Sequence, residues 1–282
     1  MIVFPNCKIN LGLHITRKRP DGYHDLETVF YPLPLRDAIE VITSPVSAQG
    51  FPLHQGAEDV ELFLSGLPVQ GTTADNLCVK AWHLLKKDFP QLPPIQLHLH
   101  KAIPMGAGLG GGSADAAFTL QLLNNKFRLG LTTEQLLDYS LQLGSDCPFF
   151  IINKPCIATG RGELMQAIPL DLSAWSFLLV YPAVHINTGW AFSQITPAPP
   201  LQPLSEIIRQ PVETWKNTLI NDFEAPVCQH HPALQNIKET LYTAGAAYAS
   251  MTGSGSCFYG IFPKGKVPQD LFPSYKFYIL NA

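Results

Sequence analysis

The stretch Pro104-Met-Gly-Ala-Gly-Leu-Gly-Gly-Gly-Ser-Ala-Asp115 decides how this chain folds, because it places five glycines in seven positions between a strand pattern and a helix pattern. Upstream, apolar and polar residues alternate over 95–101, which is typical of a half-buried strand. Downstream, Ala117 and Leu120 share one face of a helix that we expect to begin near Ser113. The context is therefore strand, loop, helix.

Such a loop predicts a cradle for phosphate groups. Glycine reaches left-handed backbone angles and has no side chain, so several successive N–H groups can turn toward a polyphosphate. The start of the following helix adds unpaired N–H groups and the positive end of the helix dipole. A glycine-rich turn without a ligand is the alternative.

Two other glycine motifs do not match this stretch. The P-loop ends in Gly-Lys-Ser/Thr, but Gly112 is followed directly by Ser113. The G-x-S-x-G elbow of hydrolases fails because Asp115 stands where its second glycine belongs. Neither motif therefore explains the loop.

A dinucleotide fingerprint matches only by letter, through Gly106, Gly108 and Gly111. That motif also requires an acidic residue at a strand end about 20 residues later, which binds the ribose. Glu134 lies instead in a segment with helical spacing that starts at Thr133. The pattern is therefore weak evidence for a dinucleotide.

The composition favours a soluble protein of two domains. The 282 residues suffice for two cores, 46% of them are hydrophobic, and no apolar run approaches the roughly 18 residues that cross a bilayer. The net charge of −3 leaves no basic stripe, and the group Arg17-Lys-Arg19 is expected to lie in a solvated turn. We expect neither a nucleic-acid nor a membrane partner.

Six cysteines are scattered along the chain without a C-x-x-C pair. This spacing argues against zinc and disulfides and favours reduced thiols that act as small buried hydrophobic side chains. The N-terminus has no basic region ahead of its short apolar run, so it predicts a first strand rather than an export signal. We expect a cytoplasmic protein.

The mixture of strands and helices predicts an α+β fold with two layered lobes and a boundary near residues 153–165. In the first half we expect strands over 2–15, 37–43, 60–65 and 95–101, and helices near 76–88, after the glycine loop and over 132–144. In the second half we expect strands over 176–181, 246–250 and 257–262, a helix near 231–244, a proline-rich connection over 196–203 and a second glycine turn over 251–257.

A phosphoryl-transfer site needs a cradle, a divalent ion, a cation near the transferred group and a carboxylate near the attacking hydroxyl. Lys8 and Asn10 share one face of an otherwise apolar strand, because residues i and i+2 point the same way. A buried lysine needs an anion or a carboxylate nearby, so Lys8 is the candidate cation. The alternative is an outward-facing lysine on an edge strand.

Two further segments carry candidate groups. Asp146 follows a predicted helix end and precedes the apolar run 147–151, so it is the candidate carboxylate, with a capping or turn aspartate as the alternative. The turn Asp21-Gly-Tyr-His24 brings an aromatic residue and a histidine together, and this pair can stack on and hydrogen-bond to a base or a sugar. Spacing alone does not decide whether Lys8 meets Asp146.

Taken together, these motifs resemble those of the GHMP small-molecule kinases over nearly the whole chain. The resemblance is carried by residues 6–10, 21–24, 104–115, 144–148, 217–224 and 252–255. It implies a two-lobed GHMP kinase fold, with an N-terminal nucleotide-binding lobe that resembles a ribosomal-protein domain (residues 1–155), a C-terminal ferredoxin-like lobe (residues 156–282) and a site between them. The implied cofactors are ATP and Mg²⁺, with the metal ligands left open.

The resemblance also implies an activity. The Gly-Tyr-His and Asn-Asp-Phe-Glu segments point to phosphorylation of the 2-hydroxyl of 4-diphosphocytidyl-2-C-methyl-D-erythritol, a step in non-mevalonate isoprenoid biosynthesis. The alternatives are a related kinase acting on homoserine, mevalonate or a sugar, a catalytically silent nucleotide-binding regulator, and a dinucleotide-dependent oxidoreductase. A monomer or weak homodimer is expected.

Each implied role falls on a residue of this chain. Asp146 would be the general base, and Lys8 would orient it and stabilise the charge that develops during transfer. The ATP-binding residues would be Pro104, Met105, Gly106, Ala107, Gly108, Leu109, Gly110, Gly111, Gly112 and Ser113. The substrate-binding residues would be Asn10, Tyr23, His24, Thr188 and Phe192, with Tyr23, His24 and Phe192 around the cytidine. Segments that contain Asn76, Lys80 and Lys101 could reach the adenine.

Overall fold

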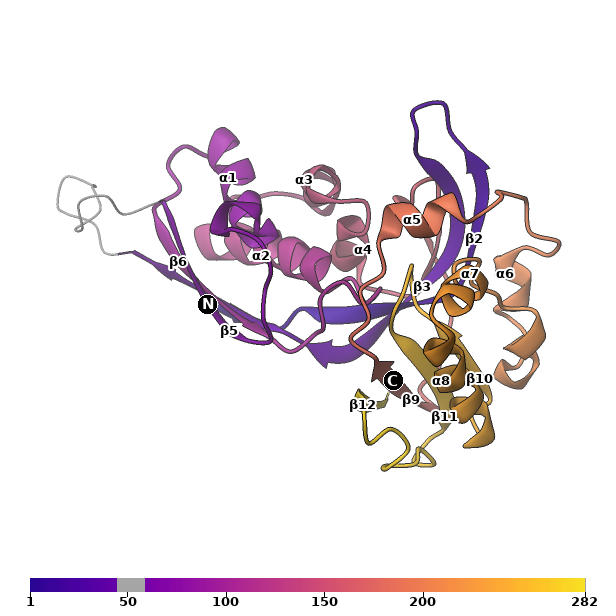
Figure 1. Ribbon diagram of the computed structural model, residues 1–282. Coiled ribbons are helices and arrows are strands. Elements are labelled where there is room, and N and C mark those ends of the chain that lie inside the picture. The colour runs from indigo at the N-terminus through magenta and orange to yellow at the C-terminus, as the bar shows by residue number, and fades with distance from the viewer. Residues whose placement is uncertain (45–58, 282) are drawn as a thin grey trace. The chain divides into compact units, whose positions relative to one another are not determined.

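The computed structural model describes residues 1–44 and 59–281, and the chain forms two compact units made of non-contiguous segments (Figure 1). Unit 1 contains Met1–Asn6, Arg36–Ile103 and Gly111–Asn153, and unit 2 contains Cys7–Leu35, Pro104–Gly110 and Lys154–Ala282. The glycine loop is thus one of the places where the chain passes from one unit to the other. The division into lobes at residues 155 and 156 stays a prediction.

Unit 1 is a four-stranded sheet with helices packed on it (Figure 1). The strand order is β1-β4-β6-β5, in which β6 pairs antiparallel with β4 and parallel with β5. The alternation predicted for β6 is confirmed, since Ile95, Leu97 and Leu99 are buried. The elements of unit 1 are β1 (Ile2–Val3), β4 (Ala38–Thr43), β5 (Val60–Gly66), η1 (Thr73–Asp75), α1 (Leu77–Asp88), β6 (Ile95–Lys101), α2 (Gly111–Phe127), α3 (Thr133–Leu143) and α4 (Cys147–Ile152).

Capping side chains mark the start of two helices of unit 1, α1 and α3. The side chain of Asn76 caps α1 by accepting a hydrogen bond from the Cys78 N–H at 2.9 Å. Thr132 and Gln135 form the reciprocal capping box of α3, and Gly144 ends that helix. Glu134 lies in the first turn of α3 rather than at a strand end, as predicted. Among the described residues, no helix is long and apolar enough to span a bilayer.

Unit 2 contains two four-stranded sheets, with the orders β2-β3-β7-β8 and β10-β11-β9-β12. Strand β9 lies inside the second sheet, and its residues 177–180 are completely buried, as its unbroken apolar run predicts. Helix α8 packs on β10 and β11 (Figure 1). The elements are β2 (Asn6–Lys18) and β3 (His24–Arg36), whose residues Asn6 and Arg36 belong to unit 1, then β7 (Cys156–Thr159), β8 (Leu164–Ala167), β9 (Trp175–Tyr181), α5 (Thr188–Ser193), α6 (Leu204–Ile207), η2 (Val212–Asn217), α7 (Glu224–His230), α8 (Pro232–Thr243), β10 (Tyr248–Met251), β11 (Phe258–Pro263) and β12 (Lys276–Asn281).

Several segments differ from the expectations: the strand expected over 2–15 is divided into β1 and β2, and the elements β7, β8, β12, α5, α6 and α7 were not predicted. Strand β3 was not predicted, because Pro32 and Pro34 weaken its strand signal. The apolar run after Asp146 forms the short helix α4. The basic group Arg17-Lys-Arg19 begins within the end of β2, and its two arginines form ion pairs with aspartates of the turn to β3 and of β3 itself. The six cysteines are free and buried, as predicted.

Candidate active site

The glycine loop has no room for a side chain at its centre. Gly106, Gly108 and Gly110 have φ angles of 64°, 76° and 71°, which glycine adopts without strain. A Cβ on Gly108 would lie 2.0 Å from the carbonyl oxygen of Thr252, and a Cβ on Gly253 would lie 3.0 Å from the Cα of Gly108. The loop and the second glycine turn of unit 2 therefore pack backbone against backbone.

Other glycines of the loop have open space beside them. The nearest atom to a Cβ on Gly106 would be His185 Nδ1 at 3.9 Å, and the nearest to a Cβ on Gly112 would be Leu77 Cδ1 at 4.0 Å. Helix α2 begins at Gly111, so its first N–H groups have no acceptor within the helix. Bare glycines and helix-start amides are the features that bind phosphate groups, and they fit ATP.

Lys8 is buried on strand β2, with 3% of its surface exposed. Its Nζ donates a hydrogen bond to Asn10 Oδ1 at 2.7 Å and lies 5.0 Å from the centroid of the Phe30 ring. The prediction that Lys8 and Asn10 share a face is confirmed. The alternative of an outward-facing lysine is wrong.

Asn10 is the centre of a hydrogen-bond network in unit 2. Its backbone N–H donates to Thr252 Oγ1 at 3.0 Å, and its Nδ2 donates to Thr28 Oγ1 at 2.9 Å. The Thr252 hydroxyl lies 3.2 Å from Asn10 Oδ1 and 3.1 Å from the carbonyl oxygen of Gly108. Thr252 therefore joins the strand that carries Lys8 to the glycine loop. Contact of Asn10 with a substrate stays a prediction.

Sequence reasoning missed the residues that hold the second glycine turn. Asn221, which is 2% exposed, donates through Nδ2 to the carbonyl oxygens of Met251 and Gly253 at 2.8 and 2.9 Å. Glu224 Oε2 accepts from the Met251 N–H at 2.7 Å and from the Ser250 hydroxyl at 2.9 Å. The signal that could have found them was the Asn-Asp-Phe-Glu segment, which places three polar side chains in four positions.

Asp146 lies in unit 1, at the start of α4, and is half-buried. Its side chain makes no capping hydrogen bond to the helix, which disfavours the capping alternative. Burial raises the pKa of the neighbouring Cys147 thiol to about 12, so this thiol stays protonated and is not a nucleophile. Since Lys8 belongs to unit 2, the pairing of Asp146 with Lys8 stays a prediction.

Two of the predicted substrate-binding residues, His24 and Phe192, contact each other in unit 2. The His24 ring stacks on the Phe192 ring with a centroid distance of 4.8 Å and an interplanar angle of 17°. Tyr23 is 55% exposed, and the Arg161 guanidinium lies 4.9 Å from the centroid of its ring. This aromatic and cationic surface suits a nucleobase that carries phosphates.

Helix α5 positions both Phe192 and Thr188. Asn187 caps the helix by accepting a hydrogen bond from the Trp190 N–H at 2.9 Å. Thr188 Oγ1 lies 3.2 Å from Ser254 Oγ, so the start of α5 contacts the second glycine turn. The same turn therefore contacts both the glycine loop and the helix that carries the predicted pocket.

The three residues considered for the adenine side have different environments in unit 1. Asn76 caps α1, and Lys80 is exposed on the same helix. The side chain of Lys101 is 1% exposed and lies between the carboxylates of Asp37 and Asp115. The ammonium group of Lys101 is therefore enclosed by protein and already paired.

Within the part of the chain that the structure describes, no three His, Cys, Asp or Glu residues cluster in a way that could hold a metal ion. Mg²⁺ bound with a nucleotide takes its oxygen ligands mainly from phosphates and water, with one or two carboxylates from the protein. A phosphate cradle with one candidate carboxylate, Asp146, is compatible with that mode of binding.

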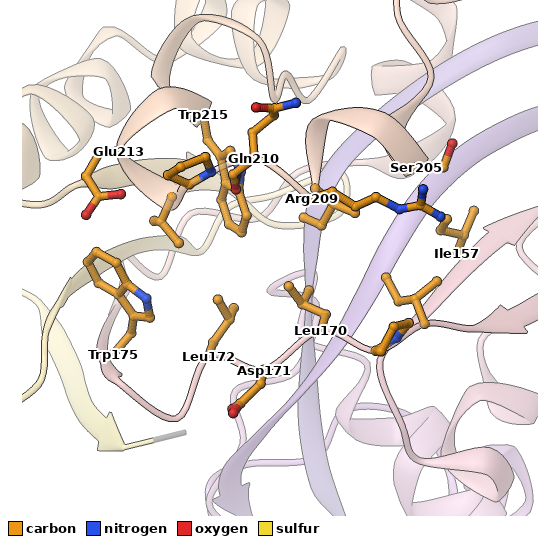
Figure 2. A pocket seen from close by; sticks show the side chains of 15 residues that line it. Ile157, Leu170, Asp171, Leu172, Trp175, Ser205, Arg209, Gln210, Glu213 and Trp215 are labelled. Carbon is orange, nitrogen blue, oxygen red and sulfur yellow. Dashed lines mark hydrogen bonds between the residues drawn. The ribbon is translucent and has the colours of Figure 1, made fainter.

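Two of the cavities in unit 2 are larger than 500 Å³. Figure 2 shows the first, of about 520 Å³, with Trp175, Trp215 and Glu213 toward one end and Arg209 toward the other. The second, of about 690 Å³, is lined by His14, Asp222 and the proline-rich connection. None of the predicted site residues is among the described residues that line either cavity.

Comparison with known proteins finds similar proteins over most of the chain. The family model described as GHMP kinases N terminal domain matches residues 76–154, and the model described as GHMP kinases C terminal matches residues 206–271. A 4-diphosphocytidyl-2-C-methyl-D-erythritol kinase of Bacteroides fragilis is 53% identical over 268 residues, which cover 95% of this chain and 94% of that protein. The kinase of the same name from Bacteroides thetaiotaomicron is 52% identical, with 95% of each chain covered.

The fold points to the same proteins. A crystal structure of 4-(cytidine 5'-diphospho)-2C-methyl-D-erythritol kinase superposes with a TM-score of 0.82 at 26% sequence identity, covering 99% of this chain and 98% of that one. The family models and the near-complete coverage at high identity confirm the resemblance inferred from the motifs. The chain belongs to the GHMP kinases and, within them, to the family of the 4-diphosphocytidyl-2-C-methyl-D-erythritol kinases.

Proposed function

We propose that this chain transfers the γ-phosphate of ATP to the 2-hydroxyl of 4-diphosphocytidyl-2-C-methyl-D-erythritol, giving the 2-phosphate and ADP, in non-mevalonate isoprenoid precursor biosynthesis. The observation that carries the proposal is the glycine loop that opens directly into α2, with space beside Gly106 and Gly112. The names and the 52–53% identity of the Bacteroides relatives support the choice of acceptor.

The proposed ATP site comprises the run from Pro104 to Ser113. Its backbone N–H groups would bind the phosphates, and the start of α2 would add its partial positive charge. Mg²⁺, when bound with the nucleotide, would neutralise charge between the phosphate oxygens. We propose that the carboxylate of Asp146 faces the place where the phosphate is transferred.

Asp146 is proposed as the general base and Lys8 as the cation that stabilises developing charge. A tertiary alcohol is a crowded and weakly acidic nucleophile, so its positioning and the stabilisation of charge must supply most of the rate acceleration. Burial of Lys8 strengthens its electrostatic effect, because water does not screen it. Asn10 holds the ammonium of Lys8 through Oδ1.

The cytidine is proposed to stack beside Tyr23 and the His24–Phe192 pair, with Thr188 and Asn10 as further substrate contacts. The Arg161 guanidinium over Tyr23 adds positive charge next to the place where a diphosphate would lie. This arrangement supports a nucleotide-bearing acceptor over a small one such as homoserine. We also propose a cytoplasmic monomer or weak homodimer without nucleic-acid or membrane partners.

The test is ADP release by the purified protein with Mg-ATP and four acceptors: the cytidylated methylerythritol, free methylerythritol phosphate, homoserine and mevalonate. We expect turnover only with the cytidylated compound. Turnover with another acceptor would keep a GHMP kinase but overturn the pocket assignment. ATP binding without turnover on any acceptor would favour a silent nucleotide-binding protein.

A further inference from the structure

Three buried charged residues of unit 1, Asp37, Lys101 and Asp115, form a cluster that we call the buried ion cluster. Lys101 Nζ donates to a carboxylate oxygen of Asp37 and to Asp115 Oδ2, the latter at 2.6 Å. Their side chains are between 0% and 4% exposed. The cluster joins three elements: the corner before β4, the end of β6 and the second turn of α2.

Asp37 holds the strand-side stem of the glycine loop. Its Oδ1 accepts hydrogen bonds from the N–H groups of Ala102 at 2.6 Å and Ile103 at 2.9 Å, immediately before Pro104. Its own N–H donates to the carbonyl oxygen of Pro5 at 2.9 Å. The direction in which the chain leaves β6 is therefore set by one buried carboxylate.

Lys101 and Asp115 hold the helix-side stem. A Cβ on Gly111, the first residue of α2, would lie 3.3 Å from Lys101 Nζ and 2.9 Å from the Cγ2 of Ile103. Asp115 lies one turn further along the same helix. The residues that precede and follow the loop segment Pro104–Gly110 therefore meet around a single ammonium group.

The cluster holds two carboxyl groups and one ammonium, so its charges balance only when one carboxyl is protonated. Asp115 Oδ1 is buried and has no hydrogen-bond partner among the described residues. A buried ion pair is often no more stabilising than apolar side chains of the same volume, so stability alone is a weak reason to keep such a cluster. A better explanation for the cluster is that it fixes the geometry of the loop stems. Hydrogen bonds between charged groups set the distance and the direction between the residues that they join.

We propose that Lys101 and Asp115 are positioning residues, which fix the two stems of the glycine loop relative to each other and so place the first N–H groups of α2 for the phosphates of ATP. This inference rests on the proposed function for its ligand, but its structural part concerns the loop stems of unit 1 alone. Small displacements of binding groups weaken binding and catalysis strongly, which makes such a support consequential.

The primary variant is Asp115→Ala, because it cuts the link between α2 and Lys101 and leaves Lys101 and Asp37 as a balanced pair. We expect the affinity for Mg-ATP, measured by calorimetry, to fall about tenfold or more, and KM for ATP to rise in parallel. KM for the cytidylated acceptor should change much less. Asp115→Asn keeps an oxygen that can accept from Lys101 and should restore most of the ATP affinity.

Leu122→Ala is the matched control, since it removes a completely buried side chain from the same helix outside the buried ion cluster. Hydrogen exchange of the stem amides of Ala102 and Ile103, which donate to Asp37 Oδ1, is read in the same proteins without nucleotide. Faster exchange there in Asp115→Ala, and not in Leu122→Ala at equal loss of Tm, is the expected result. Unchanged ATP affinity and unchanged exchange in Asp115→Ala, or equal changes in both variants, would overturn the proposal. The exchange readout remains decisive even if the protein phosphorylates no acceptor.

Discussion

At the scale of single residues, Asp146 carries the sharpest prediction. Asp146→Asn keeps the size of the side chain but removes its ability to accept a proton. We expect kcat to fall by about 10²- to 10⁴-fold, the usual worth of a general base, with ATP affinity nearly unchanged. Single-turnover kinetics and calorimetry check this, and near-normal turnover would remove Asp146 from the mechanism.

Tyr23 tests the proposed cytidine pocket at the same scale. Tyr23→Ala removes an exposed ring that the Arg161 guanidinium covers. Loss of one stacking partner should weaken binding of the cytidylated acceptor by roughly 1–3 kcal/mol, which raises KM for that acceptor. KM for ATP should stay near its original value. Steady-state kinetics with each substrate varied in turn separates the two constants. Equal effects on both would show that Tyr23 does not line the cytidine pocket.

At the scale of elements, the close contact between the glycine loop and the second glycine turn leaves no room for a side chain at Gly108. Gly108→Ala places a Cβ 2.0 Å from the carbonyl oxygen of Thr252, so one of the two turns must move. A left-handed backbone costs a residue with a side chain about 1–2 kcal/mol. We expect the free energy of unfolding to fall by well more than this amount, and KM for ATP to rise. Chemical denaturation and steady-state kinetics measure these effects.

Gly130 offers the matched control for that prediction. Its φ of 75° is within a degree of the 76° of Gly108, yet nothing lies within 4 Å of a Cβ at this position. Gly130→Ala should therefore show the backbone strain alone, with normal kinetics. If the two variants lose the same free energy of unfolding, the packing of the two turns contributes nothing to stability.

At the scale of the whole molecule, the buried ion cluster makes stability depend on pH. Burial raises the pKa of Asp115 from 3.8 to about 7, because Lys101 does not compensate fully and the charge of Asp37 opposes ionisation. A carboxyl that holds its proton more tightly when folded stabilises the protein below its unfolded pKa, and this contribution is lost as pH rises from about 4 to about 7. The wild-type protein should thus lose stability over this window relative to Asp115→Asn, by at most about 1.4 kcal/mol per pH unit.

Urea denaturation of both proteins between pH 4 and pH 8 measures this difference. The subtraction cancels the histidines and the carboxylates outside the buried ion cluster, whose surroundings are the same in the two proteins. If the difference in the free energy of unfolding between the two proteins stays constant across this range, Asp115 is ionised throughout the range in the folded protein. A difference that grows at low pH rather than at high pH would mean that its pKa is lowered by folding.

Much of the fold followed from local patterns. The alternation of β6, the capping box of α3 and the apolar run of β9 are each properties of a few neighbouring residues, and each element formed where it was expected. Strand β3 was missed because local preference argues against a strand with two prolines, and pairing with other strands of its sheet overrides that preference. The six buried thiols followed from their spacing alone.

The amino-acid sequence by itself determined the glycine loop, the helix that follows it, the strand face that Lys8 and Asn10 share, and the family. These depend on residue chemistry at short spacing, which the sequence displays directly. Only the tertiary structure decided that Thr252 joins Asn10 to Gly108, that Phe192 stacks on His24, and that Lys101 lies between Asp37 and Asp115. Those contacts join positions far apart in the chain, and whether such groups meet is set by strand pairing and by the closing of the core around them, which no local pattern encodes.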